Sequence, residues 1–280
     1  MSDRDPEQQP ARIDQPERTD LPEQAERVGR VDEGDGATDT EAAQRIIRLL
    51  WDPPATTPPR GPRPKIGLTD VITAGVAIAD QEGLTSLSMR KVASRLGVGA
   101  MSLYTYVPGR DELIELMVDR VHGELTLPAA DLPWRVSVEH QVKERWRMYE
   151  RHPWLLDFNM ARMPVGPHVM DADEALYAAI LRTGLQGAEV VSVTNMIIWQ
   201  LLGAARSEIV EADETRRTGT SAEAYWNSRM SFWETYFDYD RYPSMVAIWS
   251  AGGFDDEEAH AFDRQLSRLL DGLESRLGQR

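Results

Sequence analysis

The sequence predicts an all-α protein, and three observations carry this prediction. Apolar residues recur at the spacing of a helix in most segments beyond residue 68. Glycines and prolines mark the ends of these segments, and Ser or Thr stands before several of them. No segment alternates apolar and polar residues as a half-buried strand does. We therefore expect a small N-terminal helical unit followed by a larger helical bundle.

The charge is unevenly distributed along the chain. The 280 residues hold 31 Lys and Arg against 46 Asp and Glu, a formal net charge of -15. Residues 1–59 carry -7 (7 basic, 14 acidic), residues 60–122 carry +1 (8 and 7) and residues 123–280 carry -9 (16 and 25). A basic patch spread over the whole chain is excluded, because the overall field repels nucleic acid.

The absence of certain residues and segments narrows the class further. There are no cysteines, which excludes disulfides, thiolate nucleophiles and the common cysteine zinc sites. The longest stretch without charge, 190–205, is 16 residues long, shorter than the ~20 residues that span a bilayer. No apolar segment follows the N-terminus as in a secretory signal. We expect a cytoplasmic protein.

Residues 1–57 form an acidic, proline-rich tail that we expect to be largely disordered. A short helix over 38–51 is predicted within it, because Thr38 and Glu41 have the spacing of a capping box and Pro53 and Pro54 stop the helix. It is either a docking helix for a partner or a marginal helix that forms only against the rest of the chain.

Three short helices are predicted between residues 58 and 107. The first is capped by Thr69 and ends at Gly83, and the second is capped by Ser88 and ends at Gly97. The third begins at residue 99 or 100 and ends by residue 107, because a proline follows.

The break between the second and third helices is about three residues long, so their backbones must nearly touch. Such a crossing requires a small side chain at the contact and a glycine at the turn, and Ala93 and Gly97 provide them. The pattern predicts a helix-turn-helix with an exposed recognition helix. The alternative is an ordinary corner between two helices of a bundle.

Two sequence runs in this region resemble a known family. They are Gly-Leu-Thr-Ser-Leu-Ser-Met-Arg-Lys-Val-Ala-Ser-Arg-Leu-Gly-Val at 83–98 and Met-Ser-Leu-Tyr-Thr-Tyr-Val-Pro-Gly-Arg-Asp-Glu-Leu at 101–113. Together they resemble the DNA-binding domain of the tetracycline-repressor (TetR) family of transcriptional regulators. The resemblance implies a helix-turn-helix domain over 58–125 and a helical ligand-binding and dimerisation domain over 126–280. It also implies a homodimer that binds a near-palindromic operator and is released by a small molecule.

The resemblance assigns roles in DNA binding to residues whose chemistry suits them. Arg90 is the expected base reader, since its guanidinium can bind a guanine edge or a phosphate with two hydrogen bonds. Base-facing positions of the third helix are Ala100, Met101 and Ser102, and the phosphate contacts are Tyr104, Tyr106 and Arg110. Ser88 and Lys91 are weaker candidates, and Lys91 is otherwise part of a solvated face. The stretch ahead of the first helix holds Arg60, Arg63 and Lys65, which form either a minor-groove arm or a plain linker.

The rest of the chain reads as a helical bundle. A fourth helix over 109–125 joins the DNA-binding unit to it, and further helices are predicted over 132–151, 167–183, 188–211, 221–237 and 255–277. The helices near 188–211 and 255–277 resemble the pair that forms the four-helix dimer interface of the family. A wholly intramolecular core is the alternative.

A looser resemblance to the tetracycline-repressor branch places effector contacts in the bundle. His122, Gln141 and Asn159 fall where that branch has drug-contacting residues. Because Asn159 replaces a magnesium-binding histidine, and an amide is a poor single ligand for magnesium, we expect no metal and no other cofactor. The remaining candidates are aromatic and Met side chains typical of an apolar cavity: Trp146, Tyr149, Phe158, Met160, Met163 and Trp199. Each of them is otherwise a core residue.

The sequence thus predicts a homodimeric repressor released by a small, partly apolar effector. An activator, or a DNA-binding protein without an effector, is the alternative, because the sign of regulation is not written in the sequence. An enzyme is disfavoured, since the chain shows no nucleophile elbow, no phosphate loop and no ligand spacing among its histidines.

Overall fold

The computed structural model describes residues 36–53, 66–253 and 261–278, and these residues form helices and no strand. This confirms the all-α fold class. In chain order the elements are α1 (Gly36–Trp51), α2 (Leu68–Glu82), η2 (Leu84–Ser86), α3 (Met89–Leu96), α4 (Ala100–Leu103), α5 (Arg110–His122), α6 (Trp134–Arg151), η3 (Pro153–Asp157), η4 (Met160–Arg162), α7 (Pro167–Leu181), α8 (Ala188–Thr218), α9 (Ala222–Asn227), α10 (Met230–Thr235), α11 (Pro243–Ser250) and α12 (Ala261–Leu277).

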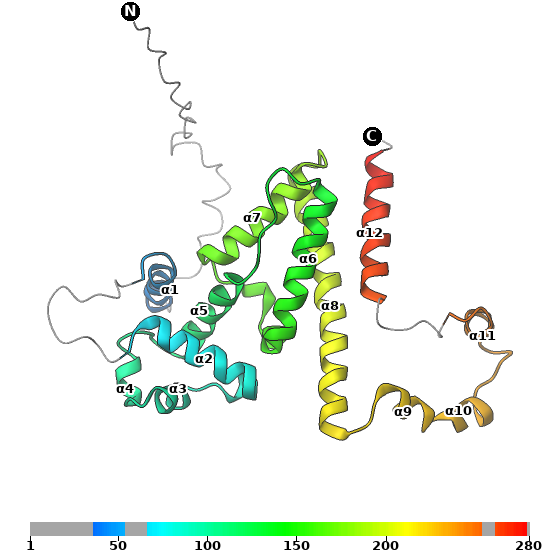
Figure 1. Cartoon of the computed structure of the whole chain (residues 1–280), viewed down its shortest axis with the longest axis horizontal. Helices are drawn as coiled ribbons and strands as arrows, with labels where there is room; N and C mark the ends of the chain where they lie inside the picture. Colours follow the sequence, from blue (N-terminus) through cyan, green and yellow to red (C-terminus); the bar gives the residue numbers. More distant parts are fainter. Residues whose placement is uncertain (1–35, 54–65, 254–260, 279–280) are drawn as a thin grey trace, which may run out of the picture. The chain divides into compact units, whose positions relative to one another are not determined.

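Residues 66–122, which we call the reader, fold into α2 to α5 (Figure 1). Helix α2 packs against both α3 and α5, and Val71, Ile78 and Val92 are almost completely buried there. The predicted cap at Thr69 is wrong. The carboxylate of Asp70 instead accepts the N–H of Gly67 at 2.8 Å, so the helix begins earlier and Thr69 lies inside it.

The tight turn between α3 and α4 has the predicted construction. The Ser88 hydroxyl caps α3 by accepting the N–H of Lys91 at 3.3 Å. Gly97 ends the helix with a φ of 67°, in the left-handed region, and Ala93 is buried at the crossing. Helix α4 is a single turn, and its Leu103 is fully buried. The outward side of α4 is therefore available for contacts outside the chain.

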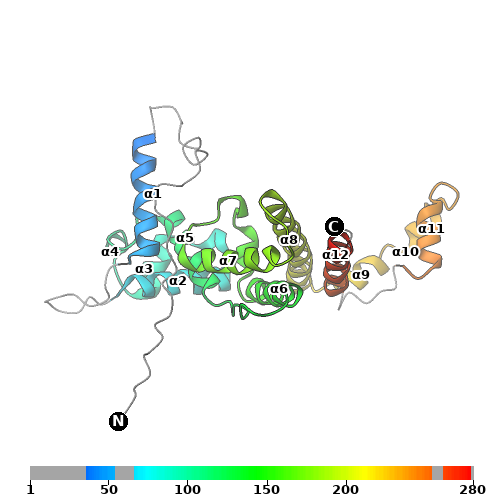
Figure 2. The same cartoon turned by 90° about the horizontal axis from the view of Figure 1, so that it is seen from above.

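The residues from 123 onward, which we call the body, are organised around α6, α7 and α8. These three helices pack on one another, as both Figure 1 and Figure 2 show, and α12 packs on α8. Helix α8 is longer than predicted, because it continues past residue 211 and ends only at Gly219, whose φ is 70°. Among the described helices, it is the one whose length and composition would allow it to cross a bilayer. This is weak evidence for a membrane helix, because core helices of soluble proteins can meet the same criteria.

The single helix predicted over 221–237 is wrong. The structure has α9 and α10 there, separated by Ser228 and Arg229, and the additional helix α11 follows. The Ser228 hydroxyl donates to the carbonyl of Tyr225 at 2.7 Å, and the Arg229 guanidinium donates to the same carbonyl at 3.1 Å. These two side chains provide hydrogen bonds to a carbonyl of the last turn of α9, which stabilises the end of the helix there.

The short helix predicted over 38–51 is present as α1. In its last turns Ile46 and Leu50 are buried, and the indole N–H of Trp51 donates to the carbonyl of Val165 at 2.7 Å. The end of this helix thus packs against the body, just ahead of α7. The stretch with Arg60, Arg63 and Lys65 lies outside the described residues.

Candidate nucleic-acid interface and buried polar cluster

The outward sides of α3 and α4 carry exposed side chains suited to DNA. Arg90 is exposed near the start of α3 and makes no hydrogen bond or ion pair within the described part of the chain. On α4, Met101 is 79% exposed, and Ser102 and Tyr104 are also exposed. A guanidinium, a methionine and two hydroxyl groups can together read base edges and phosphates.

Other predicted contacts are already engaged within the reader. Arg110 donates from Nε to the carbonyl of Leu87 and from Nη2 to the carbonyl of Leu84, both at 2.9 Å. The hydroxyl of Tyr106 donates to the carbonyl of Ile66 at 2.9 Å. Both side chains therefore hold segments of the reader together, and a phosphate would compete with these hydrogen bonds.

The weaker candidates also have internal partners. The Nζ of Lys91 forms an ion pair with Glu82 at 2.6 Å, and the hydroxyl of Ser88 is the cap of α3. Ala100 is half-buried at the start of α4. Arg90, Met101, Ser102 and Tyr104 are thus the members of the predicted set that are freely presented.

The body contains a buried polar cluster that joins three helices. On α6, the Nη1 of Arg145 donates to the Oε1 of Gln141 at 2.9 Å, and its Nη2 donates to the carbonyl of Ala172 on α7 at 2.9 Å. Asp173 of α7 completes an ion pair at 3.6 Å. Burial lowers the pKa of Arg145 and raises that of Asp173.

Two further titratable groups of the cluster stay neutral near pH 7. Burial lowers the pKa of His122 on α5 to about 4, and its Nδ1 lies 2.7 Å from the carbonyl of Val118, to which it must donate. Burial also raises the pKa of the Tyr149 hydroxyl to about 12. The cluster therefore presents one guanidinium, paired with Asp173, among neutral hydrogen-bonding groups.

Two buried polar atoms in the body have no partner among the described residues. They are the Nε2 of Gln141 on α6 and the Oγ1 of Thr194 on α8, and both side chains are more than nine-tenths buried. A buried polar atom without a hydrogen bond costs about 1–3 kcal/mol. Such atoms are candidates for contact with a ligand.

The aromatic residues predicted for the effector site are dispersed. Trp146, Phe158, Met160 and Met163 are half-buried, and the Trp146 ring stacks on Phe262 of α12 at 4.6 Å between centroids. Asn159 is exposed and caps η4, and Trp199 is 68% exposed on α8. Of the predicted set, only His122, Gln141 and Tyr149 belong to the buried cluster.

Comparison with known proteins decides the family. The family model described as "Tetracyclin repressor-like, C-terminal domain" matches residues 127–277, and that described as "Bacterial regulatory proteins, tetR family" matches residues 71–117. The chain belongs to the TetR family. It is a DNA-binding transcriptional regulator with a helix-turn-helix reader.

Individual relatives agree with this TetR assignment. The HTH-type transcriptional repressor DrrR1 of Streptomyces coeruleorubidus is 42% identical over 250 residues, which cover 88% of this chain and 92% of the relative. An HTH-type transcriptional regulator of Saccharopolyspora erythraea is 30% identical and covers 77% of this chain and 88% of its own. Among solved structures, apo ActR of Streptomyces coelicolor superposes with a TM-score of 0.62 at 23% identity, over 77% of this chain and 98% of its own.

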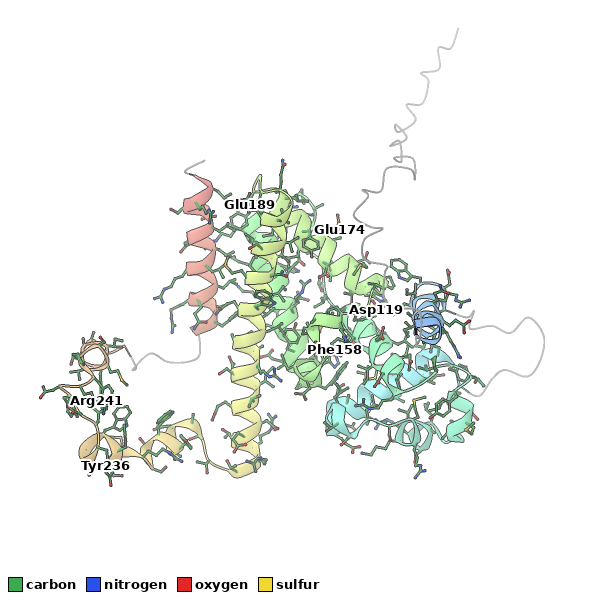
Figure 3. All side chains as sticks on the ribbon, turned by 180° about the vertical axis from the view of Figure 1, so that it is seen from behind. Asp119, Phe158, Glu174, Glu189, Tyr236 and Arg241 are labelled. Carbon is green, nitrogen blue, oxygen red and sulfur yellow. The ribbon has the colours of Figure 1, made fainter. Side chains whose placement is uncertain are left out.

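An acidic residue that the sequence analysis did not single out joins the reader of this TetR protein to its body. Asp119, labelled on α5 in Figure 3, accepts the backbone N–H groups of His168 and Val169 at 3.0 and 3.1 Å and pairs with the His168 ring at 2.8 Å. It thereby caps the start of α7. A Cβ at Gly166 would collide with the Oδ1 of Asp119, so only glycine allows this approach.

Asp119 and Arg145 share a feature that sequence patterns cannot show. Each lies on a helix whose neighbouring positions are apolar and buried, and each is satisfied by partners far away in the chain. A charged residue in an otherwise inward-facing position was the available signal, but its partners come from the fold.

Within the described ranges, no group of three His, Asp or Glu side chains could hold a metal ion.

Proposed function

We propose that this TetR protein is a homodimeric, cytoplasmic repressor that binds a near-palindromic operator and is released by a small, partly apolar effector. The observation that carries DNA recognition is the exposed set of Arg90, Met101, Ser102 and Tyr104 over α3 and α4. Two copies of such a helix-turn-helix would read two half-sites about one helical turn apart. The names of the relatives DrrR1 and the Saccharopolyspora regulator support a role in transcription.

An exposed apolar face on α8 supports the dimer. Met196, Trp199 and Val210 are 44%, 68% and 57% exposed, and at 3.6 residues per turn they lie within about 60° of one another. Gly203 lies on the same face, with no atom within 4 Å of where its Cβ would stand. A glycine in mid-helix costs about 1 kcal/mol relative to alanine, and close approach of a second helix would explain it.

We propose that α12 contributes less to the dimer interface than the family resemblance implies. Its Leu266, Leu270 and Leu273 are buried against the rest of the same chain. Gln265 of α12 also accepts a hydrogen bond from Gln200 of α8 at 2.7 Å. We therefore propose that α12 holds α8 in place, and that α8 makes the central contacts between subunits.

The buried polar cluster supports an effector site. Gln141 and Thr194 each keep an unpartnered buried atom, and Trp146, Phe158 and Met163 pack against the same hydrophobic core. An effector with hydrogen-bonding groups on an apolar framework would satisfy those atoms. The charge of Arg145 acts on His122 of α5, so binding at the cluster can shift α5 and with it the reader. To change the affinity for the operator measurably, the effector must bind the DNA-free form more tightly by ~1–3 kcal/mol.

DNA retardation tests the regulator itself. Purified protein should retard the DNA upstream of its own gene at low salt and protect two half-sites, and an unrelated fragment of equal length is the control. Failure to retard this DNA would remove the proposed operator at that site. Light scattering should show a dimer at micromolar concentration, and Trp199→Asp should convert it to a monomer. A monomeric wild-type protein would contradict the dimer.

A release screen tests the effector. We expect at least one compound of a small-molecule library to release the retarded DNA from the wild-type protein. Gln141→Leu and Thr194→Val should raise the concentration needed for release while leaving DNA binding intact, because neither residue lies in the reader. If both variants release DNA as the wild type does, the effector does not bind at the cluster.

A further inference from the structure

A histidine of the body lies between one carboxylate of the reader and one carboxylate that directly follows the reader in the chain. His152 stands at the junction of α6 and η3, and only 6% of its surface is exposed. Its Nδ1 lies 2.7 Å from an Oδ1 of Asp80, and its Nε2 lies 3.1 Å from an Oε2 of Glu124. The two ring nitrogens thus bring a carboxylate of α2 and a carboxylate that follows α5 to the same side chain.

Each carboxylate has a second donor from the same part of the body. The indole N–H of Trp154 donates to the Oδ1 of Asp80 at 2.8 Å, and the Nε of Arg151 lies 3.6 Å from Glu124. The side chains of residues 151, 152 and 154 thus bind two carboxylates. We call the five side chains the latch: Asp80, Glu124, Arg151, His152 and Trp154. They include all the charged groups that the described contacts place against His152.

The latch joins the elements that recognition depends on. Asp80 lies on α2, which packs against α3 and α5, and Glu124 follows the end of α5. On the other side, His152 directly follows α6, the helix that carries Gln141, Arg145 and Tyr149. Tyr149 precedes His152 by three residues, less than one helical turn. A shift at the end of α6 therefore reaches α2 without passing through α5.

We propose that His152 is a positioning residue: by its contacts with Asp80 and Glu124, it fixes the orientation of the reader on the body. The contact with Asp80 reaches the reader through α2. It is separate from the contact that Asp119 of α5 makes with α7. This role requires DNA recognition by the reader, but neither an effector nor a dimer. When the latch opens, α2 with α3 and α4 can turn relative to α6, and the recognition surface is no longer held in one orientation.

Distance measurements within one chain test this directly, because the cysteine-free sequence allows spin labels at two introduced cysteines. Thr85 in the reader and Asp171 on α7 are exposed and outside the latch. Labels at Thr85→Cys and Asp171→Cys, in protein diluted with unlabelled chains, should give one narrow distance distribution at pH 6. In the His152→Asn background we expect a broad distribution with at least two populations.

A matched control and a second variant separate positioning from loss of fold. His140→Asn changes a histidine of α6, the helix that His152 follows, whose Nε2 lies near the carbonyl of Thr126 and outside the latch, and it should leave the distribution narrow. Asp80→Asn should broaden it as His152→Asn does, and the double variant should be no broader than either. Circular dichroism establishes that each variant is folded. Unchanged distances in both folded single variants would overturn the proposal.

DNA binding gives a second readout. Retardation of the gene's own upstream DNA is measured in parallel, with about a tenfold loss of affinity expected for His152→Asn. If the wild type retards no DNA while the latch variants broaden the distances, the operator proposal fails and the latch stands.

Discussion

The reader and the body place their functional polar groups in opposite ways. In the reader, Arg90 and Ser102 are exposed and Arg90 has no partner within the described chain, whereas in the body Gln141 and Arg145 are buried and bonded to each other. A DNA duplex is a large, rigid polyanion, so its contacts must project outward. A small molecule gains affinity when it is surrounded. The difference predicts that substitutions in the body act mainly on stability, and that those in the reader act mainly on recognition.

Arg145→Ala should show the largest effect on stability. It removes the donors to Gln141 and to the carbonyl of Ala172 and leaves Asp173 without its ion pair. Removing one partner of a buried pair costs about 4 kcal/mol. Chemical denaturation should measure this loss in the free energy of unfolding. Arg147→Ala on the same helix removes a pair with Glu144 whose arginine side chain is 60% exposed, and it should cost about 1 kcal/mol. Equal effects would refute the contrast between buried and exposed groups.

His122 should make stability depend on pH. Its pKa falls from 6.5 to about 4 on folding, so the unfolded chain takes up the proton first as the pH decreases. The stability that depends on a neutral His122 is therefore fully present above pH 6.5. As the pH falls toward 4, the free energy of unfolding decreases by about 3 kcal/mol. Denaturation at pH 7 and pH 4 should show this loss in the wild type and a correspondingly smaller loss in His122→Gln. The same pH dependence in both proteins would mean that the ring is not held neutral by burial.

Arg90→Ala should affect recognition rather than stability. Loss of a bidentate contact to a base should reduce discrimination between operator and unrelated DNA by about 2 kcal/mol. Arg95→Ala is the matched control, since Arg95 lies on the same helix but donates to Gln81 at 3.1 Å. Titrations against both DNAs measure the ratio of affinities. If the two variants lose discrimination equally, Arg90 has no special role in reading bases.

Arg110→Ala tests whether Arg110, unlike the exposed Arg90, acts mainly within the reader. Its guanidinium donates to the carbonyls of Leu84 and Leu87, so we expect a loss of about 2 kcal/mol in the free energy of unfolding. Any weakening of DNA binding should then be the same for all sequences. A fully stable variant with a flatter dependence on salt would instead show a phosphate contact.

The sequence predicts the reader more completely than the body because the reader is built from local rules. Ser88 as a cap and Gly97 as a left-handed stop depend on nearby residues and could be read directly. Arg145 could not, because Ala172 and Asp173 approach it only after α6 and α7 pack together. The same limit applies to Arg110, whose charge predicts a phosphate contact but whose hydrogen bonds depend on the path of the chain after α2.

Gly97→Ala should give the smallest stability effect and isolates the backbone of the turn. A Cβ at this position meets no atom within 4 Å, so the cost arises from the φ of 67° alone and should be about 1 kcal/mol. Gly99 is the matched control in the same turn, with a φ of -72° and no neighbour nearer than the Ser102 hydroxyl at 4.0 Å. Gly99→Ala should therefore change stability by less than about 1 kcal/mol, because the restriction of the unfolded chain offsets the poorer N-cap that alanine gives α4. Thermal unfolding of both variants measures the difference. Equal melting temperatures would show that the turn tolerates a side chain at either glycine, and that the close crossing of α3 and α4 does not require the left-handed residue.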